Sequence, residues 1–528
     1  MPSNEFAIYS ANIFTGDPKA PWAQAVGVKD GVIAFVGSDE EVKQAMGEAK
    51  SYDMKGRLVC PGLTDSHCHF ISLGQSLMQV DMRNLTSLKA CRERLKEAAA
   101  KAKPGQWVLG RNWNHHMWEE GREPVKADMD DLLPDNPAMM VRVCGHSQWV
   151  NSKALEACGI TKDTPDPSGG KYERDENGEP TGLLREARRV IMSFVPKPSR
   201  EELKEAALTA QKKALAGGLT RVHSYESLAE WDAFSELEKE GKLKIRVNHL
   251  IHTDDLMKAV ERGIKPGMGS DRLWIGHIKH FADGSLGANT ALLFEPYCDE
   301  PDNCGLPFLD QDELKERLAK AYEHGFGIAI HAIGDKAVYN CLEAIESARQ
   351  KHPKDDRRDS IEHVQLCRPQ DLERFIDMDI AASVQPVFIP TDWAVAESRW
   401  GADRCKNGYS WKTIMEKNIR IQFGSDSPVE PIEPIYGLQA AVLRQTTDLK
   451  PEGGWLPEQR LSLEQALTGF TRTPAWTARK EDVLGKIAPG AWADMTIFAK
   501  DLAQTPAEEW IGVDTEMTII GGEVVYQK

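Results

Sequence analysis

The sequence lacks the features that mark several classes of protein. Its ten cysteines include no Cys-x-x-Cys pair, so neither a zinc ribbon nor a thioredoxin-type redox site is indicated. Ten cysteines in 528 residues are too dilute for a secreted disulfide scaffold. No stretch approaches the roughly 20 apolar residues that span a bilayer, and the N-terminus has no basic start followed by an apolar core. We therefore expect a cytoplasmic protein without membrane contact.

The chain also lacks a block of lysines and arginines. Sixty-five basic residues stand against 81 acidic ones, which gives a formal net charge of −16. This balance argues against nucleic acid or an anionic membrane as a partner. A hydrophobic fraction of 41% and a charged fraction of 28% are typical of a globular protein and exclude disorder as the dominant state. A small-molecule substrate is the partner that remains.

The two ends of the chain resemble each other. Residues 25–37 form two short apolar runs around an Asp-Gly turn, which predicts a hairpin. Residues 494–498 and 517–526 show the same pattern of short apolar runs near the other end, with Gly-Gly at the turn. We expect residues 1–57 and 481–528 to pair into one small β-sandwich domain, with the rest of the chain inserted into it.

Between the two ends, short β-branched runs alternate with amphipathic segments, which predicts an α/β fold with a parallel sheet. Eight such units fit a (β/α)8 TIM-like barrel over 58–74 and 206–480. The strand candidates are 58–66, 218–224, 243–250, 272–282, 326–331, 359–364, 379–386 and 419–426. About 150 residues separate the first candidate from the second, against roughly 30 for one unit. Residues 75–205 are therefore expected to form an α/β insertion after the first barrel strand.

The strongest chemical signal is the segment Pro61-Gly-Leu-Thr-Asp-Ser-His67-Cys-His69. Side chains alternate between the two faces of a strand, so His67 and His69 point to one side and Cys68 to the other. Two imidazoles on one face make a chelating pair for a metal such as zinc. The alternative, two core or surface histidines, stays open for this segment taken alone.

Three further residues end apolar strands in the same way. His331 ends residues 326–331, His363 ends residues 360–363 and Asp426 ends residues 419–426. Each could be structural by itself, because a strand-end histidine often makes one hydrogen bond and an aspartate often caps the next helix. A barrel brings the ends of its strands to one mouth. The five residues together therefore predict one metal site there.

This pattern resembles the amidohydrolase superfamily of metal-dependent hydrolases, and further motifs resemble its YtcJ-like branch, which includes N-substituted formamide deformylases. The motifs are residues 107–110, 145–152, 279–287, 331–335, 362–363 and 424–428. The resemblance covers nearly the whole chain and implies the barrel with a split β domain. It implies His67, His69, His331, His363 and Asp426 as metal ligands.

The resemblance also gives Lys279, on the fourth strand candidate, a role. Binuclear members of the superfamily carry a lysine carboxylated by CO2, whose carbamate bridges two metals. A carbamate is an anionic oxygen ligand, whereas a free ammonium would be repelled by two divalent cations. Two alternatives remain: a mononuclear site that Lys279 only lines, and an ion pair of Lys279 with Asp283.

The reaction that follows is hydrolysis of a C–N bond in an amide or N-substituted formamide. A divalent metal lowers the pKa of water to about 7 and so supplies hydroxide. Asp426 would act as the general base and then as the acid that protonates the leaving amine. We expect zinc, one or two ions per chain, although manganese, iron and nickel suit the same ligands. Cyclic amide opening, ester hydrolysis, metal-assisted isomerisation and a non-catalytic ligand-binding barrel are the alternatives.

Substrate contacts are assigned on weaker grounds. His146 and Trp113 lie in the expected insertion, and His223 ends the second strand candidate. Residues 114–116 read Asn-His-His where related sequences usually have Asp-Glu after the tryptophan, so contacts carried over from relatives are in doubt here. Trp393, Trp400 and Trp411 follow the seventh strand candidate and suggest an aromatic or apolar group on the substrate. A homodimer is left open.

Overall fold

The computed structural model describes residues 5–354 and 356–528, which form two compact units. One unit comprises the chain up to Leu73 together with Ala210–Lys528, and the other comprises Gly74–Thr209, where the sequence predicted an insertion over 75–205. Helices α2 (Phe70–Met78) and α7 (Arg200–Ala216) contain the two crossing points. Among the described residues, no helix has both the length and the apolar character needed to cross a membrane.

The first unit contains an eight-stranded parallel sheet in which neighbouring strands follow chain order. The strands are β8 (Leu63–Cys68), β15 (Leu219–Glu226), β16 (Arg246–His252), β17 (Leu273–Phe281), β18 (Ile328–Ala332), β19 (Ser360–His363), β20 (Ala381–Val384) and β21 (Ile421–Phe423). A parallel bridge between Cys68 and Ser427 links the segment after β21 to β8. At the same place the N–H of Asp426 donates to the carbonyl of His67 over 2.6 Å. The sheet is thereby nearly closed, and the predicted barrel is confirmed.

Helices follow the strands of the barrel and pack their apolar sides against it. In α11 the buried residues recur every three or four positions, which is the pattern of a helix with one face on the core. Its neighbour α10 begins at Asp310, whose carboxylate accepts the N–H of Glu313 as an N-cap. The helices are α8 (Leu228–Lys239), α9 (Leu256–Glu261), α10 (Gln311–Glu323), α11 (Asp335–Lys351), α12 (Leu372–Asp377), α13 (Ile389–Trp400), α14 (Ala402–Cys405), α15 (Trp411–Glu416), α16 (Pro434–Leu443) and α17 (Leu463–Thr477).

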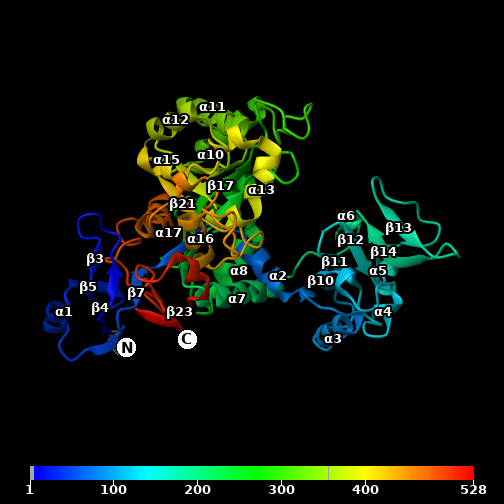
Figure 1. Cartoon of the computed structure of the whole chain (residues 1–528), viewed down its shortest axis with the longest axis horizontal. Helices are drawn as coiled ribbons and strands as arrows, with labels where there is room; N and C mark the ends of the chain where they lie inside the picture. The colour runs from blue at the N-terminus through cyan, green and yellow to red at the C-terminus, as the bar shows by residue number, and fades with distance from the viewer. Residues whose placement is uncertain (1–4, 355) are drawn as a thin grey trace. The chain divides into compact units, whose positions relative to one another are not determined.

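Both ends of the chain build the small β domain that the sequence predicted, shown in blue and red in Figure 1. One sheet has the order β5-β4-β1-β6 and the other β24-β23-β22-β7-β2-β3. The strands are β1 (Phe6–Tyr9), β2 (Asn12–Phe14), β3 (Trp22–Ala23), β4 (Ala25–Lys29), β5 (Val32–Gly37), β6 (Lys50–Asp53), β7 (Leu58–Pro61), β22 (Met495–Phe498), β23 (Thr515–Ile520) and β24 (Glu523–Gln527), and α1 (Asp39–Met46) joins them. Asp30 and Gly31 both have positive φ at the first hairpin turn, as a type I′ turn requires.

One strand boundary was predicted wrongly. The candidate 58–66 is two strands, because β7 pairs with β2 and β22 in the small β domain while β8 begins the barrel at Leu63. Gly62 separates them, and a Cβ there would lie 2.2 Å from Oγ1 of Thr220. The two domains also share a buried ion pair, in which Arg246 Nε at the start of β16 lies 2.6 Å from the carboxylate of Asp494. A continuous apolar run therefore conceals a change of sheet.

The second unit holds a six-stranded mixed sheet in the order β13-β14-β12-β11-β10-β9. Its strands are β9 (Val80–Asp81), β10 (Val108–Trp113), β11 (Ala138–Arg142), β12 (Ser147–Val150), β13 (Lys171–Arg174) and β14 (Pro180–Arg185), with helices α3 (Leu88–Ala99), α4 (Ala127–Asp130), α5 (Ser152–Ala157) and α6 (Arg188–Met192). Trp113, Trp149 and Met140 are central to one of its two apolar clusters. The unit is therefore an α/β unit with its own core.

Candidate metal centre

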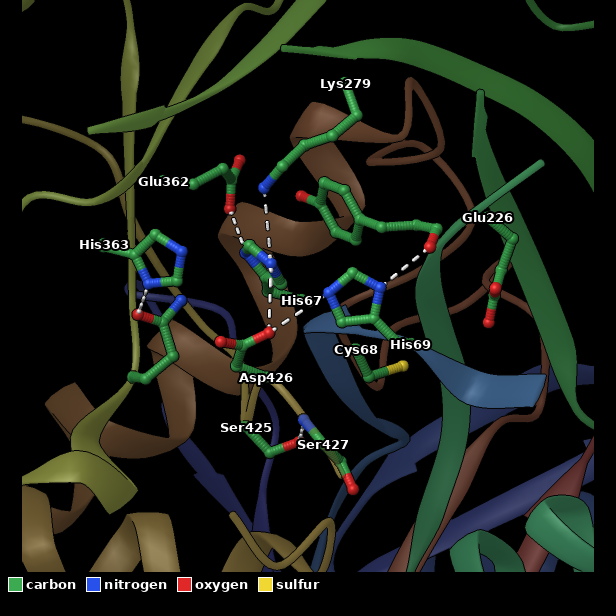
Figure 2. Close-up of polar contacts among 12 residues, drawn as sticks. His67, Cys68, His69, Glu226, Lys279, Glu362, His363, Ser425, Asp426 and Ser427 are labelled. Carbon is green, nitrogen blue, oxygen red and sulfur yellow. Dashed lines mark hydrogen bonds and ion pairs between the residues drawn. The ribbon is translucent and has the colours of Figure 1, made fainter. Parts of the chain in front are cut away.

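The His-x-His segment and Asp426 converge at the carboxyl end of the barrel strands (Figure 2). His67 lies in β8 and His69 follows it directly, while Asp426 follows β21. The Nε2 atoms of His67 and His69 lie 3.5 and 3.3 Å from the same oxygen of Asp426. Ligand atoms of all three residues lie within 4.8 Å of one another. The structure thus joins residues that are about 360 positions apart in the chain.

Each of these two imidazoles is oriented by a hydrogen bond from its other nitrogen. Nδ1 of His67 donates to the carboxylate of Glu362 over 2.8 Å, and Nδ1 of His69 donates to the carbonyl of Tyr225 over 3.0 Å. Donation from Nδ1 leaves Nε2 as the lone-pair nitrogen, and Nε2 is the atom that faces Asp426. This is the arrangement that a metal-binding imidazole needs.

Glu362 is a functional residue whose role sequence reasoning missed. It is fully buried in β19, and the hydroxyl of Ser360 donates to its second oxygen. The Tyr225 ring stacks on His67 with 4.1 Å between ring centroids. The only sequence signal was a carboxylate at an inward position of an apolar strand next to His363, and its partner His67 lies 295 residues away.

Lys279 lies on β17, the fourth strand of the barrel, and its Nζ is 3.4 Å from Nε2 of His67. Nζ also lies 4.5 Å from the centroid of the Tyr225 ring. Burial lowers the pKa of Lys279 to about 8, since the low-polarity surroundings disfavour the ammonium form. Asp283 instead accepts the main-chain N–H groups of Leu292, Ile333 and Gly334.

The two remaining predicted ligands stand side by side on adjacent strands. The rings of His331 and His363 have centroids 4.4 Å apart, and His363 is 4.9 Å from His67 by the same measure. Nε2 of His331 donates to the carbonyl of Gly284, and Nδ1 of His363 donates to the amide oxygen of Gln385, both over 2.8 Å. Each imidazole therefore keeps its second nitrogen as a candidate ligand atom.

Charge and backbone geometry both mark this place. Burial alone would raise the pKa of Asp426, but the basic groups around it, His67, His69 and Lys279, outweigh burial and hold the pKa below its ordinary value. Asp426 is therefore a carboxylate at neutral pH. His363 and Asp426 have φ angles of 77° and 56°. Left-handed backbone in residues other than glycine costs about 1–3 kcal/mol and is concentrated at functional sites.

A cavity of about 230 Å³ adjoins the centre. It is lined by His69, Tyr225, Glu226, Ser227, Glu230, His252, Lys279 and Phe281. A larger cavity of about 1020 Å³ lies between the loop after β2 and helix α17. None of the candidate ligands lines that larger cavity, so the smaller one is the chemically relevant space.

None of the three predicted substrate contacts is among the described residues that line the cavity beside the ligands. His223 is buried in the middle of β15, which ends at Glu226, so the prediction that it ends its strand is wrong. Trp113 is fully buried in the second unit and donates its indole N–H to the carbonyl of Met140. It is a core residue and not the predicted substrate contact.

His146 and the segment 114–116, both in the second unit, lie at the surface of that unit. Nδ1 of His146 lies 2.7 Å from the carboxylate of Glu186, and 70% of the His146 side chain is exposed. Residues 114–116, which read Asn-His-His where related sequences differ, belong to the 3-10 helix η1 (His115–Met117) and its N-cap. The side chain of Asn114 is that N-cap. A substrate contact by His146 stays a prediction.

Comparisons with known proteins agree with this geometry. A model of the amidohydrolase family matches residues 50–526. YtcJ of Bacillus subtilis (strain 168), which carries the name of an amidohydrolase, is 36% identical over 98% of this chain and 98% of its own length. An N-substituted formamide deformylase of Arthrobacter pascens is 26% identical over 99% of this chain and 98% of its own length.

A solved structure is similar in sequence as well as in fold. The crystal structure of an uncharacterised metal-dependent hydrolase from Pyrococcus furiosus has a TM-score of 0.78 and 31% sequence identity. The match covers 93% of this chain and 98% of the Pyrococcus chain. The similarity therefore extends over most of this chain and is not confined to the barrel.

Proposed function

Since this chain belongs to the amidohydrolase family, we propose that it is a metal-dependent hydrolase that cleaves the C–N bond of an amide or an N-substituted formamide. One observation carries the proposal: His67, His69 and Asp426 direct three ligand atoms at one point. The formamide substrate is suggested by the deformylase relative, which aligns over nearly its whole length.

The residues present fit a divalent metal. Imidazole nitrogens and a carboxylate oxygen suit zinc, and both histidines have the second hydrogen bond that orients such ligands. His67, His69 and Asp426 would hold the first ion, with His331 and His363 completing the centre or holding a second. The ion would lower the pKa of water to about 7 and polarise the carbonyl of the substrate.

Proton transfer falls to Asp426. Its carboxylate is ionised at neutral pH because its pKa lies below the ordinary value. It takes the proton of the attacking water and delivers that proton to the leaving nitrogen, so that the amine departs neutral.

Lys279 is proposed to carry a CO2-derived carbamate when two metals bind. Only the free amine reacts with CO2, and a pKa lowered to about 8 by burial gives Lys279 a larger share of free amine than an exposed lysine has. In a centre with one metal, Lys279 would instead line the site as an amine or ammonium.

A substrate panel tests the proposed reaction. Metal-loaded protein is incubated with N-substituted formamides, linear amides, lactams and esters, and the products are identified by mass. Release of an amine together with formate or the matching carboxylic acid, with masses that add up to the substrate plus one water, supports the proposal. Products of unchanged mass would favour an isomerase, and ring opening or ester cleavage alone would redirect the substrate class. The Asp426→Asn protein serves as the control for contaminating activity.

A further inference from the structure

The cavity beside the metal centre has two chemically different ends. His69 and Lys279 border it on the side of the centre, while Glu226, Ser227 and Glu230 lie where β15 leads into α8. In Figure 2, Glu226 lies beyond His69 as seen from Asp426. The cavity therefore leads from the proposed reaction centre towards two carboxylates.

Aromatic rings form its wall. The Phe281 ring at the end of β17 has its centroid 5.6 Å from the ring of His252 and 5.6 Å from that of His331. Tyr225 also lines the cavity and stacks against His67. Ring faces attract cations as well as apolar groups.

Hydrogen bonds hold both carboxyl groups in place. Burial raises the pKa of Glu226 to about 7, and a cation bound beside it would favour the ionised form. Glu226 accepts the N–H of Ile71 over 2.8 Å at the start of α2, and Glu230 accepts the N–H of Ser227 over 3.0 Å. Neither glutamate forms an ion pair with a lysine or arginine in the described part of the chain. Lys279 is the one basic side chain among the lining residues other than histidine, and its Nζ lies beside the metal centre, 3.4 Å from Nε2 of His67.

The end of the cavity near Glu226 and Glu230 does not have the ligand set of a metal site. Within residues 5–354 and 356–528, only His67, His69 and Asp426 bring three ligand atoms of histidine, cysteine or acidic side chains within 4.8 Å. The volume of about 230 Å³ equals roughly seven or eight waters at about 30 Å³ each, which is the size of a short organic substituent.

We propose that this cavity selects substrates with a cationic group, such as a protonated amine or a guanidinium, on a short apolar arm near the scissile bond. Glu226 and Glu230 pair with the cation, while Phe281 and Tyr225 contact the arm. This inference rests on the proposed function, because it assigns the cavity to the substrate of the same centre. Hydrogen bonds to charged groups are worth enough to give at least a tenfold preference.

The test compares three matched formamides in which a four-carbon arm ends in an ammonium, a methyl or a carboxylate group. We expect kcat/KM to be at least tenfold higher for the ammonium compound than for the methyl compound, and lowest for the carboxylate compound. Glu226→Gln and, separately, Glu230→Gln should each reduce the ammonium-to-methyl ratio at least fivefold. The exposed Glu416→Gln on α15 is the matched control and should keep the ratio.

Binding of butylamine, which is a cation at neutral pH, and of uncharged butan-1-ol, measured by calorimetry on metal-loaded protein, separates this inference from the reaction. Tighter binding of butylamine than of butan-1-ol, lost in Glu226→Gln, supports the cation site even if no formamide is cleaved; that result would refute the formamide reaction alone. Cleavage of all three formamides at similar rates, or equal binding of butylamine and butan-1-ol, overturns the inference and leaves the proposed reaction standing. Circular dichroism of each variant establishes that a lost preference is not lost folding.

Discussion

Replacing Glu362 with glutamine is expected to weaken metal binding although the residue touches no proposed substrate. The carboxylate is fully buried and lies 2.8 Å from Nδ1 of His67, so it fixes the tautomer that presents Nε2. Glutamine keeps the shape but is a weaker acceptor, and its amide nitrogen would compete for the same position. Loss of such an orienting partner costs about 10- to 100-fold in metal affinity, or roughly 1.4 to 2.7 kcal/mol.

The assay is a competition titration. Protein stripped with a chelator is titrated with Zn²⁺ in the presence of a chromophoric chelator, and the Kd of Glu362→Gln is compared with that of the unmodified chain. Glu362→Ala should weaken binding further, because it leaves Nδ1 of His67 buried and unpaired. Glu156→Gln, an exposed residue of α5 paired with Lys153, is the control and should bind as the unmodified chain does. An unchanged Kd in a folded Glu362→Gln protein would refute the orienting role.

Three further outcomes are expected. Asp426→Asn should lower turnover by about 10²- to 10⁴-fold while elemental analysis still finds much of the metal. The reason is that an amide cannot accept and return the proton, whereas its oxygen can still bind a metal. Turnover near that of the unmodified chain would refute the proton-transfer role. Arg246→Ala should destabilise the chain by about 3–5 kcal/mol in urea unfolding, since Asp494 is left buried and unpaired; a loss below about 1 kcal/mol contradicts this. Trp113→Ala should cost about 3–5 kcal/mol of unfolding free energy with the metal content unchanged, and lost metal with unaltered stability would argue for a site role instead.

Much of the barrel and of the metal centre could be predicted because both depend on short sequence patterns. Each barrel strand is a short apolar run. His363 ends β19, His331 lies one residue before the end of β18, and Asp426 lies three residues beyond β21. Parallel strands of a barrel all end at one mouth, so residues far apart in the chain could be assigned to one site.

The features that escaped prediction depend on contacts that no local pattern encodes. The change of sheet at Gly62 follows from a close approach of Thr220, about 160 residues away, and a continuous apolar run gives no sign of it. Trp113 was proposed as a substrate contact from its place in the insertion, and no local pattern there shows that its ring is buried in a core. From the sequence alone, the Glu362 carboxylate could have had a purely structural role. Its role depends on its hydrogen bond with His67, which only the structure shows.

The measurement that tests the central claim most directly is the metal content of the chain, purified without chelators in bicarbonate buffer and compared with a His67→Asn/His69→Asn protein. We expect one or two divalent ions per unmodified chain, with two favouring a carbamate at Lys279, and almost none in the double variant while circular dichroism shows the fold retained. If the unmodified chain holds no metal and cannot be reconstituted with zinc, manganese, iron or nickel, or if the double variant binds metal equally well, the proposed centre is contradicted.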